Sequence, residues 1–270
     1  MTTRILRYLL LAAGAVVMTL PFAWMVTTAF KTLPEALAPT VVWLPAQWQW
    51  QNFAETFRAA PFERYFLNSF IVGFTVTAAN VLTSIAAGYA FARLDFLGKK
   101  LLFAIVLATM MIPFEVTLIP NFVMIRRLGW YNTYLALIVP WCASAFSIFL
   151  MRQAFLTLPA DFFDAAKVDG CGHLRFLLRI AAPLVRPAIV TIGLFAFLGS
   201  YNSLIWPLVV TGEDTMRVVQ VGLTVFSGAE GVRLHLLMCA STVVILPTVA
   251  LYLAAQRYFL ESSLGSGIKG

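Results

Sequence analysis

The chain contains six apolar segments, each about 20 residues long or longer, separated by polar connections, of which 31–65 and 152–186 are long. They lie at roughly 8–30, 66–91, 101–122, 133–151, 187–210 and 234–256. A helix needs about 20 predominantly apolar residues to cross the hydrocarbon core of a bilayer, because each residue adds only about 1.5 Å. The sequence therefore predicts an all-α integral membrane fold with six transmembrane helices, and we expect residues 1–270 to form a single transmembrane domain.

The composition argues against an ordinary soluble domain. Residues AVILMFWYC make up 61% of the chain, and Asp, Glu, Lys and Arg make up only 11%, against roughly 25% in a typical soluble domain. So few charges cannot cover a core of this size in water. The net charge of +7 fits the accumulation of Lys and Arg in cytoplasmic loops. We expect no nucleic-acid partner, because no basic stripe is interleaved with aromatic residues.

For the first apolar segment, a cleaved signal peptide is the alternative interpretation. The apolar core of a signal peptide has about 7–15 residues and precedes a small-residue cleavage site. The segment from Tyr8 to Phe30 is longer, so we interpret it as an uncleaved first helix. The connection after it carries three tryptophans that suit a bilayer interface, and a short interfacial helix is expected from Gln51 to Arg64.

Basic residues favour one orientation of the chain in the membrane. With both termini in the cytoplasm, twelve of the 19 Lys and Arg residues fall on the cytoplasmic side. Arg126 and Arg127 oppose this bias, but moving their loop inside breaks the alternation of spans. The seven on the outer side are Lys31, Arg58, Arg64, Arg126, Arg127, Arg217 and Arg233.

Motifs for catalysis or for metal binding are sparse. The cysteines at 142, 171 and 239 are odd in number and widely spaced, so no disulfide framework or metal site follows from them. His173 and His235 stand alone. The chain has no phosphate-binding G-x-x-x-x-G-K-[ST] sequence. We therefore expect no catalytic residues, no metal and no cofactor bound by this chain, so that any ATP-driven step needs a separate protein.

The most informative segment is 158–187, with the sequence LPADFFDAAKVDGCGHLRFLLRIAAPLVRP. It is too polar to span a membrane and too apolar for a disordered tail. Asp161 is positioned to cap a first short helix. Two glycines then allow a sharp bend, and a second helix is expected from His173 to Ile180, ending before Pro183. The prediction is a helix–bend–helix at the membrane surface, with its apolar face toward the spans.

This segment resembles the EAA loop of bacterial ABC-importer permeases, whose pattern is roughly E-A-A-x-x-D-G. Asp164 stands where that family usually has Glu, which keeps the charge on a shorter side chain. The matching residues are Asp164, Ala165, Ala166, Asp169 and Gly170, with Ile180 and Pro183 downstream. Other stretches are similar to the carbohydrate-uptake subgroup related to the second maltose-permease subunit: Asn68-Ser69, Pro113 to Pro120, LGWYNT, YNSLIWPLV and the tail LGSGIKG.

The resemblance implies a type I importer permease with several partners. These are a second, related permease subunit, two cytoplasmic ATPase subunits that bind ATP and Mg, and an extracytoplasmic solute-binding protein. The EAA-like residues, from Asp164 to Gly170, would contact an ATPase subunit. The implied solute is a carbohydrate or sugar-like compound, such as a disaccharide, an amino sugar, an oligosaccharide or a glycerophospho-compound.

Five residues inside the apolar segments are candidates for a translocation path. Glu115 is an ionisable group in an apolar run, and exposure near the outer surface is the alternative. In the fifth segment, Tyr201, Asn202 and Trp206 lie on neighbouring faces of the expected helix. Sugars are commonly held by hydrogen bonds and by stacking on aromatic rings, so these three side chains could line a solute path. Packing around a kink at Pro207 is the alternative there. The five candidates are Glu115, Asn121, Tyr201, Asn202 and Trp206.

Other interpretations make different demands on the sequence. An ion-coupled secondary transporter needs buried carboxylates or broken helices in symmetric halves, but only Glu115 is a candidate and the halves do not repeat. A membrane enzyme needs clustered catalytic side chains, and none is visible. An ABC permease for amino acids or peptides would share the EAA loop, so only the subgroup resemblance argues against it. We interpret Asn80, Thr83 and Ser84 as packing groups.

Overall fold

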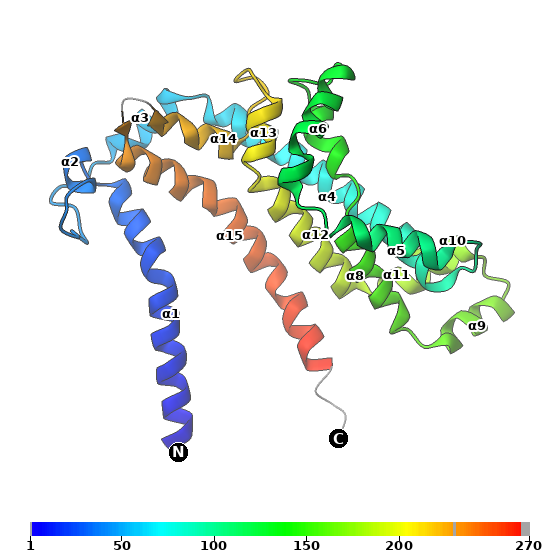
Figure 1. The fold of residues 1–270 in the computed structure, drawn as a ribbon. Helices are drawn as coiled ribbons and strands as arrows, with labels where there is room; N and C mark the ends of the chain where they lie inside the picture. The colour runs from blue at the N-terminus through cyan, green and yellow to red at the C-terminus, as the bar shows by residue number, and fades with distance from the viewer. Residues whose placement is uncertain (1, 229–230, 266–270) are drawn as a thin grey trace. The chain divides into compact units, whose positions relative to one another are not determined.

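The computed structural model describes the backbone of residues 2–228 and 231–265, and these segments are mostly helical (Figure 1). The C-terminal tail LGSGIKG lies largely outside the described residues. The chain divides into two compact units. One comprises Met1–Glu63 with Val219–Thr248, and the other comprises Arg64–Val218 with Val249–Gly270.

Within the described residues, four helical segments are long and apolar enough to cross a bilayer, and two bent helix pairs raise the number to six. The four are Arg4–Ala29, Phe62–Arg93, Tyr134–Leu156 and Leu234–Gln256. The bent pairs are Lys99–Thr109 with Phe114–Arg127, at 97°, and His173–Leu184 with Arg186–Tyr201, at 83°. The prediction of six apolar spans is confirmed when each bent pair counts as one span.

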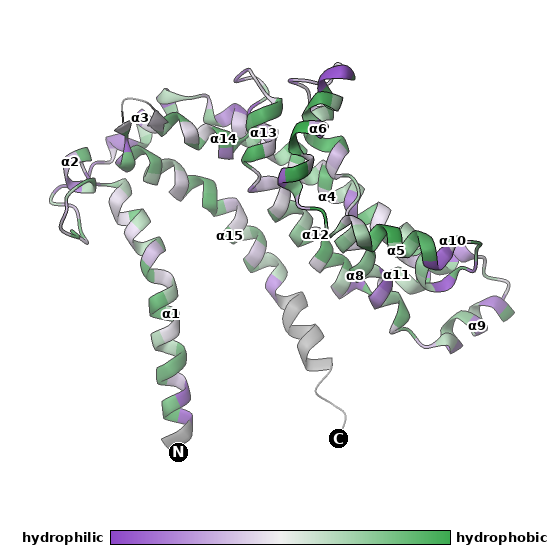
Figure 2. Ribbon diagram, viewed as in Figure 1, coloured by the Kyte–Doolittle hydropathy of each residue, from purple (hydrophilic) through white to green (hydrophobic). Residues whose placement is uncertain are grey.

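The first unit begins with α1 (Thr2–Ala29), which is hydrophobic along most of its length and hydrophilic near its N-terminal end (Figure 2). The polar end contains Arg4 and Arg7. The remaining elements are α2 (Leu33–Ala36), α3 (Gln51–Ala59), α14 (Val219–Leu223), the 3₁₀ turn η3 (Thr224–Phe226), the antiparallel pair β1 (Ser227–Gly228) and β2 (Gly231–Val232), and the first part of α15 (Leu234–Gly265). The short helix predicted from Gln51 is therefore confirmed as a helix but ends at Ala59, and its place at the interface stays a prediction.

The connection after α1 is folded back by specific contacts. The Asn52 side chain donates hydrogen bonds to the carbonyls of Ala29 (3.0 Å) and Lys31 (2.8 Å). Thr32 and Glu35 form a capping box at the start of α2. The Glu35 carboxylate accepts from the backbone N–H of Thr32 (3.0 Å) and of Ala46 (3.1 Å). These two donors hold the pKa of Glu35 below its usual value.

The second unit contains the remaining described helices. Its long helix α4 (Phe62–Arg93) starts in the first unit. The others are α5 (Lys99–Thr109), α6 (Phe114–Arg127), α7 (Tyr134–Ile138), the 3₁₀ turn η1 (Val139–Trp141), α8 (Ala145–Leu156), α9 (Ala160–Val168), α10 (His173–Phe176), the π-helical turn η2 (Leu177–Ala181), α11 (Ala182–Leu184), α12 (Arg186–Tyr201) and α13 (Ile205–Val210).

Three of the predicted apolar spans are interrupted. In the fourth, the 3₁₀ turn η1 and residues 142–144 separate α7 from α8. In the third, the chain leaves α5 after Thr109 and restarts at Phe114 with Pro113 at the N-cap, whereas Pro120 lies inside α6. In the fifth, the prediction of one helix over 187–210 is wrong, because α12 ends at Tyr201 and α13 begins at Ile205. The residues at the breaks in the third and fifth spans are mostly exposed in this chain: 110–113 all are, and so are Asn202 and Leu204.

The connection 211–218 is tied to the first turns of α4. The Asn68 amide donates to the carbonyls of Thr215 (2.9 Å) and Arg217 (2.8 Å), and its Oδ1 accepts from the Tyr134 hydroxyl at 2.6 Å. The Tyr65 hydroxyl donates to Asp214 at 2.8 Å. The Asn of the Asn68-Ser69 pair therefore joins three segments of the chain.

Candidate functional site

The first candidate site is the surface element 158–187, which begins with α9. The helix starts at Ala160 with Pro159 as its N-cap, and no side chain caps it. The predicted capping by Asp161 is therefore wrong, because Pro159 supplies the extended backbone that starts the helix two residues earlier. Asp161 lies in the first turn instead, where a carboxylate is favoured by the helix dipole.

A left-handed glycine ends α9 and turns the chain. Gly170 has φ +71°, a conformation that other residues adopt only at a cost. The Cys171 N–H donates to the Ala166 carbonyl at 2.8 Å, and the Gly170 N–H donates to the Lys167 carbonyl at 3.0 Å. This pair of bonds is a Schellman motif, which satisfies two carbonyls at the helix end. The predicted bend is confirmed at this residue.

The second helical run extends beyond its predicted limit. It passes from α10 through η2 and α11 to Leu184, so the predicted end before Pro183 is wrong. The π-helical turn precedes Pro183 and widens the helix there, which accommodates a ring that would otherwise meet the carbonyl four residues earlier.

The inner face of α9 is fixed to the ends of α4 and α8. Ala166 is buried in a cluster with Tyr89, Met151 and Phe155, and Phe163 packs against the same cluster. The Tyr89 hydroxyl lies 3.0 Å from His173 Nδ1. Arg93, the last residue of α4, donates to the carbonyls of Phe155 and Leu158 at the end of α8. These contacts hold α9 in one position on the second unit.

The outer face of α9 carries acids beside exposed apolar residues. Asp164, Ala165, Asp169 and Gly170 are exposed, and the Val168 side chain between them is 87% exposed. Exposed apolar groups next to polar ones are typical of protein contact surfaces. Four of the five residues matched to the EAA pattern therefore lie on the accessible side, whereas Ala166 faces the core.

The five path candidates occupy different environments. Glu115 is exposed in the first turn of α6, and Asn202 is exposed at the end of α12. Tyr201 is buried and stacks on Phe197, with ring centroids 5.6 Å apart. Asn121 and Trp206 do come together, on the wall of a cavity of about 300 Å³. The buried Trp206 indole donates its N–H to the Ala136 carbonyl at 2.9 Å.

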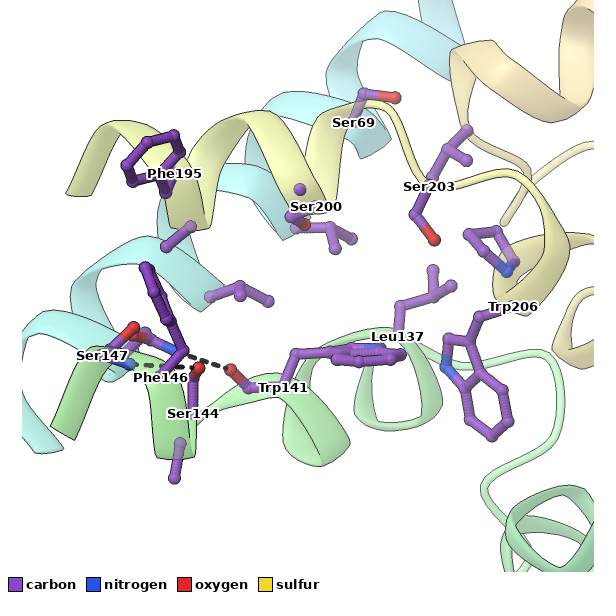
Figure 3. Close-up of a pocket in the computed structure, with 18 residues that line it drawn as sticks. Ser69, Leu137, Trp141, Ser144, Phe146, Ser147, Phe195, Ser200, Ser203 and Trp206 are labelled. Atoms are coloured by element: carbon purple, nitrogen blue, oxygen red, sulfur yellow. Dashed lines mark hydrogen bonds between the residues drawn. The ribbon is translucent and has the colours of Figure 1, made fainter. Parts of the chain in front are cut away.

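A second cavity, of about 250 Å³, lies within the second unit and shares Trp141 and Trp206 with the first (Figure 3). Its walls come from α4, from the α7–α8 segment, and from α12 and α13. Polar side chains from all three regions reach it: Ser69, Asn80, Ser144, Ser147, Ser200 and Ser203.

Sequence reasoning missed this cavity, although one signal for it exists. Ser69, Val72, Val76 and Asn80 all line it, and their spacing of three and four residues places them on one face of α4. The interpretation of Asn80 as a packing group was incomplete. Its amide donates to the Trp141 carbonyl at 3.4 Å, but its Oδ1 is buried without a hydrogen-bond partner in the described part of the chain.

These features define a class of protein: a multi-span helical membrane subunit with a rigidly docked helix–bend–helix on its surface and no nucleotide-binding motif of its own. Residues 79–260 match the family described as the binding-protein-dependent transport system inner membrane component. The chain belongs to this family. It is a multi-pass inner-membrane component of a binding-protein-dependent transport system, as the resemblance to ABC-importer permeases predicted.

Relatives with established names cover most or all of the chain. The arabinooligosaccharides transport system permease protein AraQ of Halalkalibacterium halodurans is 31% identical over 275 aligned positions, covering 100% of this chain and 99% of the relative. The sn-glycerol-3-phosphate transport system permease protein UgpE of Yersinia enterocolitica is 30% identical, covering 83% of this chain and 82% of the relative. These names support a permease for sugar-like solutes.

One solved structure has the same fold over nearly all of its length. A chain of a bacterial ABC transporter involved in the import of the acidic polysaccharide alginate superposes with a TM-score of 0.83 at 21% identity, covering 96% of both chains. The all-α membrane fold of a type I importer permease is therefore confirmed.

Proposed function

We propose that this chain forms half of the translocation path of an ATP-driven importer for a carbohydrate or sugar-like solute, and that the outer face of α9 couples it to a cytoplasmic ATPase. A second permease subunit would supply the other half of the path. ATP and Mg would bind to the ATPase subunits, and this chain would contribute no catalytic residue. An extracytoplasmic binding protein would deliver the solute.

The observation that carries the coupling proposal is the contrast between the two faces of α9. Its inner face is held by Ala166 and Phe163 in the apolar cluster, so a force applied to α9 is transmitted to α4 and α8. Its outer face presents the Asp164 and Asp169 carboxylates beside the apolar Val168. A cleft on a partner can enclose such a ridge, and a partner Arg can pair with either acid.

The sidedness of the proposal places α9 and both termini in the cytoplasm. Within the second unit, α9 lies at a different end from the hydrophilic C-terminal end of α6, where Arg126 and Arg127 are found (Figures 1 and 2). This separation supports opposite sides of the membrane for the two segments, as the alternation of spans requires.

The substrate part of the proposal rests on the relatives. AraQ is named for arabinooligosaccharides and UgpE for sn-glycerol-3-phosphate. Both solutes are polyhydroxylated, and a permease 30% identical or more to each of them is proposed to carry a solute of that kind.

The coupling proposal is tested on Asp164. In the purified complex, Asp164→Ala should leave assembly intact and reduce solute-stimulated ATP hydrolysis roughly tenfold, because a charge-assisted hydrogen bond at a desolvated contact contributes about 1.5–3 kcal/mol. Asp164→Glu should retain the stimulation. Asp95→Ala is the matched control, since Asp95 is an exposed acid whose partner is Lys99 of the same chain.

Two results contradict the proposal at different levels. If Asp164→Ala shows the same solute-stimulated ATP hydrolysis as wild type, Asp164 has no coupling role. Purification of the chain without an ATPase, together with solute uptake into liposomes by the chain alone in the absence of ATP, means a secondary transporter.

A further inference from the structure

The 250 Å³ cavity has a buried floor and an open rim. Val72, Val76 and Leu137 on its floor are each no more than 5% exposed, whereas Phe146 and Phe195 on its rim are 45% and 53% exposed. Figure 3 shows the Ser200 and Ser203 side chains on one side of the space and the Trp141 indole on the other. A solute can therefore enter past the aromatic rim and meet hydroxyl groups inside.

The strongest pointer to a ligand is the Asn80 side chain. Asn80 is 4% exposed, and its Oδ1 has no hydrogen-bond partner in the described part of the chain. The nearby Trp141 carbonyl requires the amide N–H₂ on its side, so the acceptor cannot be satisfied by flipping the group. A buried acceptor without a partner is unfavourable, and a ligand hydroxyl would satisfy it.

We propose that this cavity binds one neutral sugar ring, with a ring hydroxyl donating to Asn80 Oδ1. The inference rests on the proposed import of a sugar-like solute and narrows it to uncharged sugars. At about 250 Å³ the cavity is slightly smaller than the roughly 300–1,000 Å³ of pockets for drug-sized ligands. It therefore has room for a single ring, either a free monosaccharide or one ring of an oligosaccharide such as arabinotriose.

The lining also explains the preference for an uncharged ring. None of the described residues that line the cavity is Asp, Glu, Lys, Arg or His. A phosphate or carboxylate placed there would lose its hydration without gaining a counter-charge, which is costly. A lipid acyl chain would fit the aromatic walls but would leave Asn80 Oδ1 without a hydrogen bond. A sugar ring can stack its apolar faces on the aromatic walls and donate a hydroxyl hydrogen bond to Asn80 Oδ1.

Two variants of the complete complex test the cavity. Gly199 lines the cavity, and a Cβ at this position meets no atom within 4 Å, so Gly199→Leu fills the space without an initial clash. Asn80→Leu removes the acceptor. The control for Gly199→Leu is Gly193→Ala on the same helix α12, because a Cβ at position 193 has ordinary 3.7 Å contacts. The control for Asn80→Leu is Ser84→Ala on the same helix α4, because the Ser84 hydroxyl donates only a local hydrogen bond to the Val81 carbonyl.

The readouts are ATP-driven uptake of arabinotriose and of sn-glycerol-3-phosphate into proteoliposomes, and binding of radiolabelled arabinotriose to the complex in nanodiscs. We expect wild-type complex and both controls to import and bind arabinotriose. Asn80→Leu should weaken arabinotriose binding roughly five- to tenfold, the effect of one lost hydrogen bond. Gly199→Leu should abolish binding while the complex stays assembled.

The opposite results overturn the inference separately from the proposed function. Normal arabinotriose uptake and binding in Gly199→Leu means that the cavity holds no sugar, although the complex is still a sugar importer. A lipid that co-purifies with wild type and is lost from Gly199→Leu, with arabinotriose binding unchanged, assigns the cavity to an acyl chain. Import of sn-glycerol-3-phosphate but not of arabinotriose refutes the neutral-sugar assignment while preserving import of a sugar-like solute.

Discussion

Helices α4 and α8 pack closely at Gly88, and the substitution Gly88→Ala tests how tightly these helices support α9. A Cβ at position 88 would lie 2.8 Å from both Met151 Cβ and Met151 Cγ, and 3.0 Å from the Arg152 backbone nitrogen. Carbon atoms in favourable contact are about 3.5–4.0 Å apart. Met151 is fully buried and one of the contacted atoms is backbone, so the helices must separate by several tenths of an ångström.

The expected cost follows from the contacts that such a separation strains. Arg152 donates to the Phe91 carbonyl at 3.2 Å and its guanidinium lies 4.3 Å from the centre of the Phe103 ring. Overpacking of this kind destabilises a protein by about 1–3 kcal/mol. The gain in helix propensity from Gly to Ala, about 1 kcal/mol at most, offsets only part of it. We expect a net destabilisation of about 1–2 kcal/mol.

The assay is the thermal unfolding midpoint of the purified chain in one detergent, with Gly193→Ala as control. The control adds a Cβ with ordinary 3.7 Å contacts to Thr77 and Val81, so its midpoint should equal or exceed that of wild type. At about 2–4 °C per kcal/mol, Gly88→Ala should lower the midpoint by roughly 2–8 °C. A Gly88→Ala midpoint equal to that of the control would refute the close-packing argument.

Two further predictions concern local structure and are read by amide hydrogen exchange. Gly170→Ala should destabilise the local structure by about 1 kcal/mol, because residue 170 has a positive φ, and should speed amide exchange around residues 169–171. The control Gly172→Ala should leave exchange there unchanged, because residue 172 has an ordinary φ of −71°. Equal effects in the two variants would exclude the left-handed turn as the cause. The lowered pKa of Glu35 means that its carboxylate stabilises the 32–46 connection above the unfolded pKa of about 4.3 and that this stabilisation is lost as the pH falls through the lower folded pKa. The protection factors of the Thr32 and Ala46 amides, which compare each exchange rate with the intrinsic rate at the same pH, should therefore fall on acidification in wild type and be low at every pH in Glu35→Gln. A wild-type protection factor that does not change with pH would contradict this.

Much of the α9 element could be predicted from the sequence, because its determinants are local. A glycine six residues after Asp164 predicts a bend, and the bend is confirmed at Gly170. The assignment of inner and outer faces could not be made in this way. Ala165 and Ala166 are identical in the sequence, yet Ala166 is buried and Ala165 is exposed. That difference depends on where α4 and α8 meet the helix.

The sequence by itself determined the membrane class, the number of spans and the position of the surface element. A segment is identified as a span when its apolar length matches the thickness of the bilayer's hydrocarbon core. This comparison needs only the sequence of that one segment. Only the tertiary structure decided the breaks at 110–113 and 202–204 and the cavity that contains Asn80. The cavity joins Asn80 to Trp141 and Ser200, which lie far apart in the chain, and whether a buried amide finds a partner depends on which helices pack around it.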